Sequence, residues 1–315
     1  MKAARITATG TAPVYGDAAE PTAGEGEAVI TVTAAPISPI VRLRAAAPVP
    51  AESGVLFVGL DGVGTNGNGQ RVYFLFPKPP FGALAEKTLV PAAMTVPVPD
   101  GLGDAEAAAI ATAGMSSWAA LTRRVPIKAG QTVLVTAANG AAGRLALQVA
   151  RHLGAGRVIA VTRSTSALAG LSADQGIALE AEGADAALQE AFRAGVDIVL
   201  DYAWGAVAER IIAAVSTARG APMGEPRLRY AIIGASAGQT APLAAYAFQS
   251  SKIELIGSGI GSVAVRDYLA ACAELLGAAE EAGFEAPHEI HALSEIGEIW
   301  EQAAQRRIIL RPDQA

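Results

Sequence analysis

The stretch Thr132-Val133-Leu134-Val135-Thr136-Ala137-Ala138-Asn139-Gly140-Ala141-Ala142-Gly143 decides the fold. Its first five residues are apolar and β-rich, and the helical pattern of Arg144 to Leu153 follows its last glycine. The pattern therefore predicts a strand, a tight turn and a helix. A second β-rich run, Val158 to Thr162, begins fifteen residues after Gly143. Strand, glycine turn, helix and strand in this order are typical of a dinucleotide-binding unit.

The two glycines of this loop have separate expected roles. Gly140 lets the backbone approach a pyrophosphate closely, and Gly143 lets the helix pack on the strand, while the helix N-terminus faces the anion. Ala138 stands where the first glycine of the dinucleotide fingerprint usually lies. A strand-to-helix turn without a ligand is the alternative. The predicted phosphate loop consists of Ala138, Asn139, Gly140, Ala141, Ala142 and Gly143.

The residues after the second strand indicate which dinucleotide is bound. Where an acidic residue would hydrogen-bond the ribose 2′-hydroxyl of NAD, the sequence runs Arg163-Ser164-Thr165-Ser166. A cation and hydroxyl groups suit the 2′-phosphate of NADP, so Arg163 and Ser164 are predicted to bind NADP(H). A charge-assisted hydrogen bond contributes about 1.5–3 kcal/mol, or roughly ten- to a hundredfold in affinity. A solvated loop arginine is the alternative for Arg163.

Outward from this unit, short runs rich in Val and Ile alternate with helical segments between residues 130 and 260. Strands that are apolar throughout predict a parallel sheet covered on both faces, which is a doubly wound α/β domain. Besides the two strands above, the expected strands are Ile198 to Asp201, Arg229 to Ile233 and Ile253 to Ile256.

The flanking segments predict a different kind of structure. Short strands between turns, such as Ala28 to Val32 and Arg71 to Phe76, fill the first hundred residues, where helical periodicity is nearly absent. An Ala-rich helix with Asp104 as its N-cap follows. After Gly261 we expect helix, strand, helix and strand, over Asp267 to Ala279, His288 to Ala292, Glu295 to Gln305 and Arg307 to Leu310.

Composition excludes several classes of protein. The 315 residues are 51% apolar and 17% charged, which excludes a disordered chain, and the length suggests about two domains. The net charge of −6 provides no basic field for nucleic acid or an anionic membrane, so the expected partner is a small molecule. The single cysteine, Cys272, supplies neither a disulfide nor a multi-cysteine zinc site. No signal peptide or membrane span is recognised, so we expect a cytoplasmic protein.

Several short motifs occur in a characteristic order along the chain. They are Ala34 to Pro39, Gly59 to Gly64, Gly69 to Tyr73, Gly82 to Glu86, Val96 to Leu102, Ala107 to Ala109, Gly114 to Trp118, the loop at 138 to 143, Val196 to Asp201 and Ile233 to Gly238. In order and spacing they resemble the medium-chain dehydrogenase/reductase superfamily, specifically its zinc-free quinone-oxidoreductase-like branch. The resemblance covers nearly the whole chain.

The resemblance implies a Rossmann doubly wound parallel sheet inserted into a distorted, GroES-like β-barrel domain. The expected boundaries are 1–112 and 261–315 for the two parts of the catalytic domain and 113–260 for the dinucleotide-binding domain. A substrate cleft is expected at the junction. Relatives pair the edge strand of the Rossmann sheet across a two-fold axis, so the resemblance also implies a homodimer formed through Ile253 to Ile256.

The resemblance also assigns roles to single residues. Ser116 stands where the branch often has a threonine near the nicotinamide, and Gly234 begins a loop that passes the nicotinamide. Ser38 falls where many members have an asparagine that lines the cleft. Ala167 replaces a lysine that relatives often use for the 2′-phosphate, which leaves that role to Arg163.

Zinc is not expected. Zinc-dependent relatives have a cysteine near positions 36 to 38 and Gly-His-Glu near 59 to 61, where this chain has Pro36-Ile37-Ser38 and Gly59-Leu60-Asp61. Catalytic zinc needs three strong protein ligands. His288 and His291 resemble a metal motif, but on a strand they would face opposite sides.

The expected chemistry needs little beyond hydride delivery, because no metal and no acid–base pair is recognised near the loop. Quinones and carbonyl-conjugated alkenes qualify, since hydride leaves a phenolate or enolate that hydrogen-bond donors stabilise. Candidate donors are Ser38, Tyr73 and Ser116, with barrel core as the alternative for Tyr73. Tyr246 is a further candidate, with helix packing as its alternative. The sequence predicts an NADPH-dependent reductase of such electrophiles; the alternatives are a catalytically idle NADP-binding sensor or scaffold and a dehydrogenase of an unrelated small molecule.

Overall fold

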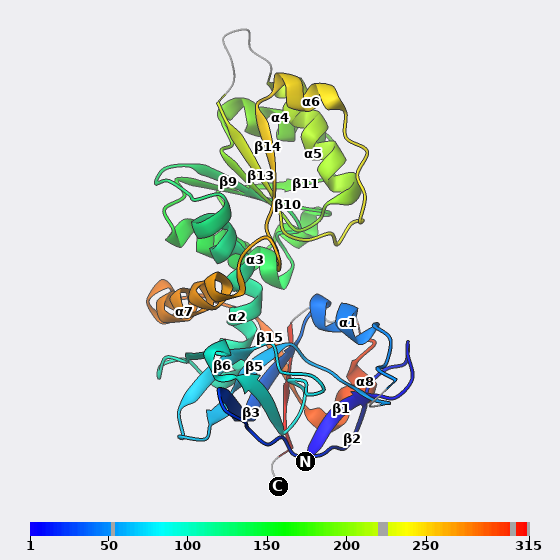
Figure 1. Ribbon diagram of the computed structural model, residues 1–315. Coiled ribbons are helices and arrows are strands. Elements are labelled where there is room, and N and C mark those ends of the chain that lie inside the picture. The colour runs from blue at the N-terminus through cyan, green and yellow to red at the C-terminus, as the bar shows by residue number, and fades with distance from the viewer. Residues whose placement is uncertain (52–53, 220–225, 303–306, 314–315) are drawn as a thin grey trace. The chain divides into compact units, whose positions relative to one another are not determined.

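The chain forms two compact units (Figure 1). The computed structural model describes residues 1–51, 54–219, 226–302 and 307–313. The first unit is built from both ends of the chain, Met1–Thr112 and Cys272–Ala315. The second unit is the continuous stretch Ala113–Ala271. Among the described residues, no helix combines the length and the apolar character needed to cross a membrane.

The second unit is built on a six-stranded sheet whose neighbouring strands are all parallel. The strand order is β11-β10-β9-β12-β13-β14, so the chain moves outward from β9 in one direction and then in the other. This is the predicted doubly wound α/β sheet, and the prediction is confirmed; only β11 was not anticipated. The strands are β9 Thr132–Val135, β10 Arg157–Thr162, β11 Gln175–Ala178, β12 Ile198–Asp201, β13 Leu228–Ile232 and β14 Ile253–Gly257.

Helices cover this sheet because its central strands carry apolar side chains on both faces. Leu134, Ile159 and Val199 pack with α4 and α5 in one core that also contains Phe192 and Ile211. Helix α3 packs against β9 and β10, away from α4 and α5 (Figure 1). The helices are α3 Ala141–His152, α4 Ala184–Ala194, α5 Gly205–Ala218 and α6 Ala245–Ser250.

The first unit contains a seven-stranded sheet and a three-stranded sheet. The larger has the order β15-β16-β3-β5-β6-β8, with β7 also paired to β3, and the smaller has the order β2-β1-β4. β16, from the C-terminal segment, therefore pairs with β3 from the N-terminal one. The strands are β1 Lys2–Ile6, β2 Val14–Asp17, β3 Glu27–Ile37, β4 Leu56–Phe57, β5 Asp61–Asn66, β6 Arg71–Leu75, β7 Lys87–Pro91, β8 Thr95–Pro97, β15 His288–Ala292 and β16 Arg307–Arg311.

Four local predictions need correction. Helix α1, Pro39–Ala45, was not anticipated; Ser38 caps it and Pro39 occupies its first turn, where a missing N–H costs nothing. Helix α2, Asp104–Ala119, includes Asp104 as its first residue, and the Asp104 carboxylate instead accepts hydrogen bonds from both Nε and Nη2 of Arg71, at 3.0 and 2.7 Å.

The predicted helix over Glu295 to Gln305 is wrong in its length. The described helix α8 covers only Ile296–Ile299, after a short 3-10 turn at Leu293–Glu295, and residues 303–306 lie outside the described residues. Helix α7, Val265–Ala282, is longer than predicted at both ends. Its length is consistent with a largely apolar sequence that is buried at Tyr268 and Leu275.

A buried pair of opposite charges lies inside the first unit. Asp61 on β5 is fully buried and Arg307 on β16 is 7% exposed. Asp61 Oδ2 accepts hydrogen bonds from the hydroxyls of Tyr73, at 3.1 Å, and Thr112. Within the described residues, Asp61 Oδ1 and Arg307 Nε and Nη2 have no hydrogen-bond partner. Burial raises the pKa of Asp61, and the charge of Arg307 acts against that shift.

We predict that Arg307→Met destabilises the first unit by about 3–5 kcal/mol, because it leaves the buried Asp61 without a countercharge. The double variant Asp61→Asn, Arg307→Met is expected to recover most of this loss. Urea unfolding followed by Trp300 fluorescence, in a background where Trp118 and Trp204 are phenylalanine, measures this unit. Equal instability of the double and the single variant would contradict the pairing.

Candidate functional site

The carboxyl ends of the parallel strands bring the predicted loops of the second unit together. The chain leaves β9 for β10 on one side and β12 lies on the other, so the strand order reverses at β9. In open α/β sheets, ligands bind in the crevice at this reversal, outside the carboxyl ends of the strands. The loops after Val135, Thr162, Asp201 and Ile232 all begin at that edge.

The predicted phosphate loop forms the turn between β9 and α3. Gly140 is the N-cap of α3, with φ −71° and ψ 163°. Ala137 has a φ of 46°, in the left-handed region, where non-glycine residues are uncommon. Gly140 N–H donates to the Ala137 carbonyl at 3.0 Å, and Ala138 N–H donates to the Val161 carbonyl at 3.1 Å. The loop is therefore held by its own backbone and by the neighbouring strand.

The two glycines differ in what surrounds them. A Cβ on Gly143 would lie 2.3 Å from the Ala137 carbonyl oxygen, so no side chain fits between α3 and the turn. A Cβ on Gly140 would have one neighbour within 4 Å, the Ala137 oxygen at 3.4 Å. The protein's own atoms therefore require glycine at 143 and leave space at 140. The first turn of α3 contains no acidic residue, so nothing there repels an anion.

Asp201 connects the segments that follow β9 and β12 with a tyrosine on β13. It is fully buried, and its Oδ1 accepts the Thr136 hydroxyl at 2.6 Å and the Ala203 N–H at 2.9 Å. Its Oδ2 accepts the Tyr230 hydroxyl at 2.7 Å. One carboxylate thus connects the ends of β9 and β12 with the middle of β13. Sequence analysis placed Asp201 only at a strand end; an acidic residue ending an apolar strand was the available signal.

Ser116 on α2 lies beside Tyr202, which sequence analysis missed. Their hydroxyl oxygens are 3.0 Å apart, and Ser116 Oγ also donates to the Ala113 carbonyl at 3.0 Å. A serine has one hydroxyl hydrogen, so Tyr202 is the donor to Ser116. Burial raises the pKa of Tyr202 to about 12, which keeps this donor protonated at neutral pH.

Gly234 also lies beside Tyr202. The Tyr202 carbonyl accepts the Ser236 N–H at 3.2 Å and the Ser236 hydroxyl at 3.0 Å. A Cβ on Gly234 would lie 2.8 Å from that carbonyl oxygen. The structure therefore brings Ser116 and Gly234, which are far apart in sequence, to either side of Tyr202.

A pocket of about 400 Å³ opens beside the phosphate loop. This volume is in the range of small-molecule sites. Arg163 is its one charged lining residue, and its side chain is 87% exposed. Ser164 is held by its own carbonyl, which accepts the Thr162 hydroxyl at 2.9 Å. The lining residues are Ala137, Asn139, Val161, Thr162, Arg163, Ser164, Ala167, Leu179, Ala203, Val207, Ser236 and Ala237.

The other predicted donors belong to the first unit. Ser38 is 3% exposed, and its Oγ accepts the Val41 N–H at 3.4 Å. Tyr73 is fully buried, with its hydroxyl directed at Asp61 and Thr112. Both therefore have structural contacts of their own, and their contact with a substrate stays a prediction. Tyr246 on α6 is 68% exposed.

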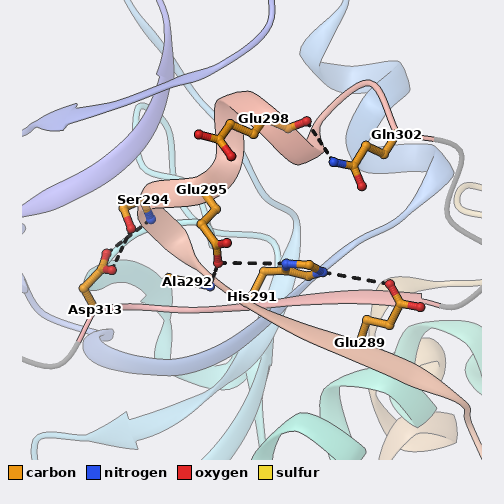
Figure 2. A network of polar contacts seen from close by, with 8 residues as sticks. All are labelled: Glu289, His291, Ala292, Ser294, Glu295, Glu298, Gln302 and Asp313. Carbon is orange, nitrogen blue, oxygen red and sulfur yellow. Dashed lines mark hydrogen bonds and ion pairs between the residues drawn. The ribbon is translucent and has the colours of Figure 1, made fainter.

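The histidine pair of β15 takes part in local polar contacts. His288 Nδ1 lies 2.9 Å from the Ala286 carbonyl oxygen. Figure 2 shows the His291 ring between Glu289 and Glu295, each with an oxygen 3.9 Å from a ring nitrogen. Glu295 also accepts the Ala292 N–H at 2.6 Å. Over the described part of the chain, no group of three or more His, Cys, Asp or Glu could hold a metal ion.

Similarity to known proteins extends over nearly the whole chain. No family model matches it. A "probable NADPH-dependent quinone reductase" of Emericella nidulans is 30% identical over an alignment of 351 positions, gaps included, which covers 95% of this chain and 96% of that protein. A mycobacterial quinone oxidoreductase gives a TM-score of 0.82 at 22% identity, over 99% of this chain and 100% of the other. The quinone oxidoreductase of Thermus thermophilus, also solved with NADPH, gives 0.79 at 25% identity, again over 99% and 100%.

We predict that alanine substitutions at the two glycines separate stability from ligand binding. Gly143→Ala is expected to destabilise the second unit by about 1–3 kcal/mol, because its Cβ would clash with the Ala137 carbonyl. Gly140→Ala is expected to change stability by less than about 0.5 kcal/mol and to weaken NADPH binding about tenfold. Thermal unfolding and fluorescence titration measure the two effects. Unchanged NADPH affinity in Gly140→Ala would contradict the assigned phosphate loop.

Proposed function

Because this chain belongs to the zinc-free quinone-oxidoreductase-like branch of the medium-chain dehydrogenase/reductase superfamily, we propose that it transfers hydride from NADPH to a quinone or a carbonyl-conjugated alkene. It is an oxidoreductase whose cofactor is NADP(H). The observation that carries the proposal is the loop that begins α3, where Gly143 leaves no room for a side chain and Gly140 leaves room for a ligand.

The residues of the second unit fit this cofactor. The loop Ala138–Gly143 would hold the pyrophosphate at the N-terminus of α3. Arg163 and Ser164, at the pocket rim, would hold the 2′-phosphate, and the pocket is large enough for an adenosine group. Ser116 and Gly234 would flank the nicotinamide. When bound, NADPH supplies the hydride. The chain's own residues bind the cofactor, orient it, and stabilise the charge that develops on the substrate.

The hydroxyl groups of the chain would stabilise the negative charge that develops on the substrate oxygen. Tyr202 is protonated at neutral pH and orients Ser116 by donating to it. Asp201 fixes the backbone from which Tyr202 projects. Preorganised donors of this kind lower the barrier because they need no rearrangement during the reaction. Ser38 and Tyr73 are the further donors that we propose; Tyr73 would have to exchange its hydrogen bond to Asp61 for one to the substrate.

We propose that residues 113–260 form the dinucleotide-binding domain and residues 1–112 and 261–315 the catalytic domain. The second unit itself extends eleven residues further, to Ala271. The six-stranded parallel sheet of the second unit supports the first assignment. The pairing of β16 with β3 supports a catalytic domain that is built from both chain ends. We also propose a cytoplasmic location, in keeping with an enzyme that draws on NADPH, and no nucleic-acid or membrane partner.

We predict that the purified chain oxidises NADPH when it is supplied with a panel of 1,4-quinones and α,β-unsaturated ketones. Loss of absorbance at the NADPH band measures turnover, and Gly140→Ala serves as the matched variant with weakened cofactor binding. Tight NADPH binding without turnover across the panel would favour the idle sensor or scaffold. Absence of NADPH binding would overturn the assignment altogether.

We also propose that the chain forms a homodimer through β14. This strand lies at the edge of the six-stranded sheet. An edge strand presents unpaired backbone groups to a partner strand. Leu255 on β14 and Ile260 just beyond it are large apolar side chains that are 39% and 45% exposed.

We predict that light scattering gives twice the chain mass of 31.8 kDa. Leu255→Lys is expected to shift the protein to the monomer, because a lysine on an edge strand opposes strand pairing. Leu43→Lys, at an apolar side chain that is 73% exposed on α1, is the matched control and is expected to stay dimeric. A monomeric parent chain, or dissociation by both variants alike, would contradict this interface.

A further inference from the structure

Glu180 lies beside Arg163 because the backbone places it there. The parallel pairing of β10 with β11 continues past both strands: Leu179 N–H donates to the Thr162 carbonyl and Glu180 N–H donates to the Arg163 carbonyl, each at 2.9 Å. In the strand register, which pairs Thr162 with Ala178, Arg163 is level with Leu179, and Glu180 comes one residue later. These backbone hydrogen bonds, and not side-chain rotamers alone, bring Arg163 and Glu180 close together.

The side chains form an exposed ion pair at the pocket rim. Arg163 Nε is 3.5 Å from Glu180 Oε1, and the side chains are 87% and 63% exposed. Leu179, which precedes Glu180, lines the pocket with Arg163. The rim thus contains one cation and, next to it, one carboxylate.

We propose that Glu180 is a specificity-determining residue that limits the preference of this chain for NADPH over NADH. The inference rests on the proposed function and deepens it. A 2′-phosphate that binds Arg163 competes with the Glu180 carboxylate for the guanidinium and approaches a like charge. A ribose 2′-hydroxyl is uncharged and can donate to that carboxylate. Glu180 therefore weakens the binding of NADPH and either leaves the binding of NADH unchanged or strengthens it.

The expected size of the effect on NADPH affinity follows from the exposure of both side chains to solvent. In water, two unit charges a few ångströms apart interact weakly, and exposed ion pairs contribute little. A phosphate carries nearly two charges, which raises the repulsion. We expect removal of the Glu180 charge to tighten NADPH binding about three- to tenfold at low salt. Salt shortens the range of the interaction, so the gain is expected to shrink at about 0.5 M.

The test measures dissociation constants by calorimetry with NADPH and with NADH, on the full chain. Glu180→Gln is expected to lower the constant for NADPH about three- to tenfold and to leave that for NADH unchanged or raised. Glu182→Gln removes the same charge two residues away, at another exposed position, and is the matched control. Arg163→Ala is expected to raise the constant for NADPH far more than that for NADH, and to reduce the gain from Glu180→Gln when the two are combined.

The outcomes separate this inference from the function on which it rests. If the parent chain binds neither NADPH nor NADH, both the proposed function and this inference are overturned. If it binds NADPH and Glu180→Gln leaves the ratio of the two constants unchanged, the inference alone is overturned. An equal gain from Glu182→Gln would also overturn it, because the effect would then reflect net charge. A selective gain that disappears at high salt supports it.

Discussion

The contact between the Ala137 carbonyl and Gly143 is the constraint on which the rest of the site depends. Helix α3 can pack this closely on the turn after β9 because residue 143 has no side chain. That close approach aims the N-terminus of α3 at the carboxyl edge of the sheet, where the strand order reverses. An anion at this edge meets free backbone N–H groups and the positive end of the helix dipole. The backbone arrangement therefore supports the proposed phosphate site independently of any charged side chain.

Two buried aspartates illustrate different uses of a carboxylate. Asp201 in the second unit has hydrogen bonds to both oxygens and fixes the loops around Tyr202. Asp61 in the first unit faces Arg307, and hydroxyl groups satisfy only one of its oxygens. A carboxylate that is fully hydrogen-bonded stabilises one geometry. A buried ion pair chiefly makes the loss of either partner costly, since the remaining charge is then uncompensated.

The proposed site has charged side chains at its adenosine end and hydroxyl groups at its nicotinamide end, and the two sets have different roles. At the adenosine end, Arg163 and Glu180 are exposed to solvent. Salt screens their charges over short distances, so both residues adjust the affinity for the cofactor and do not determine it. At the nicotinamide end, burial keeps Tyr202 protonated and oriented toward Ser116. In the proposed site, exposed charges would adjust cofactor affinity, whereas Ser116 and Tyr202, near the proposed chemistry, are partly buried and hydrogen-bonded to each other.

Strand runs, glycine spacing and helix starts are local patterns, and from them the sequence predicts the parallel sheet, the phosphate loop and the position of Arg163. The structure confirms the sheet. The sequence misjudged α1 and the length of α8, where short segments depend on capping and on tertiary contacts more than on periodicity. Only the tertiary structure revealed Tyr202 beside Ser116, Glu180 beside Arg163 and Arg307 facing Asp61. Each of these pairs joins residues on different strands or helices, and their proximity follows from strand order and register, which no local pattern encodes.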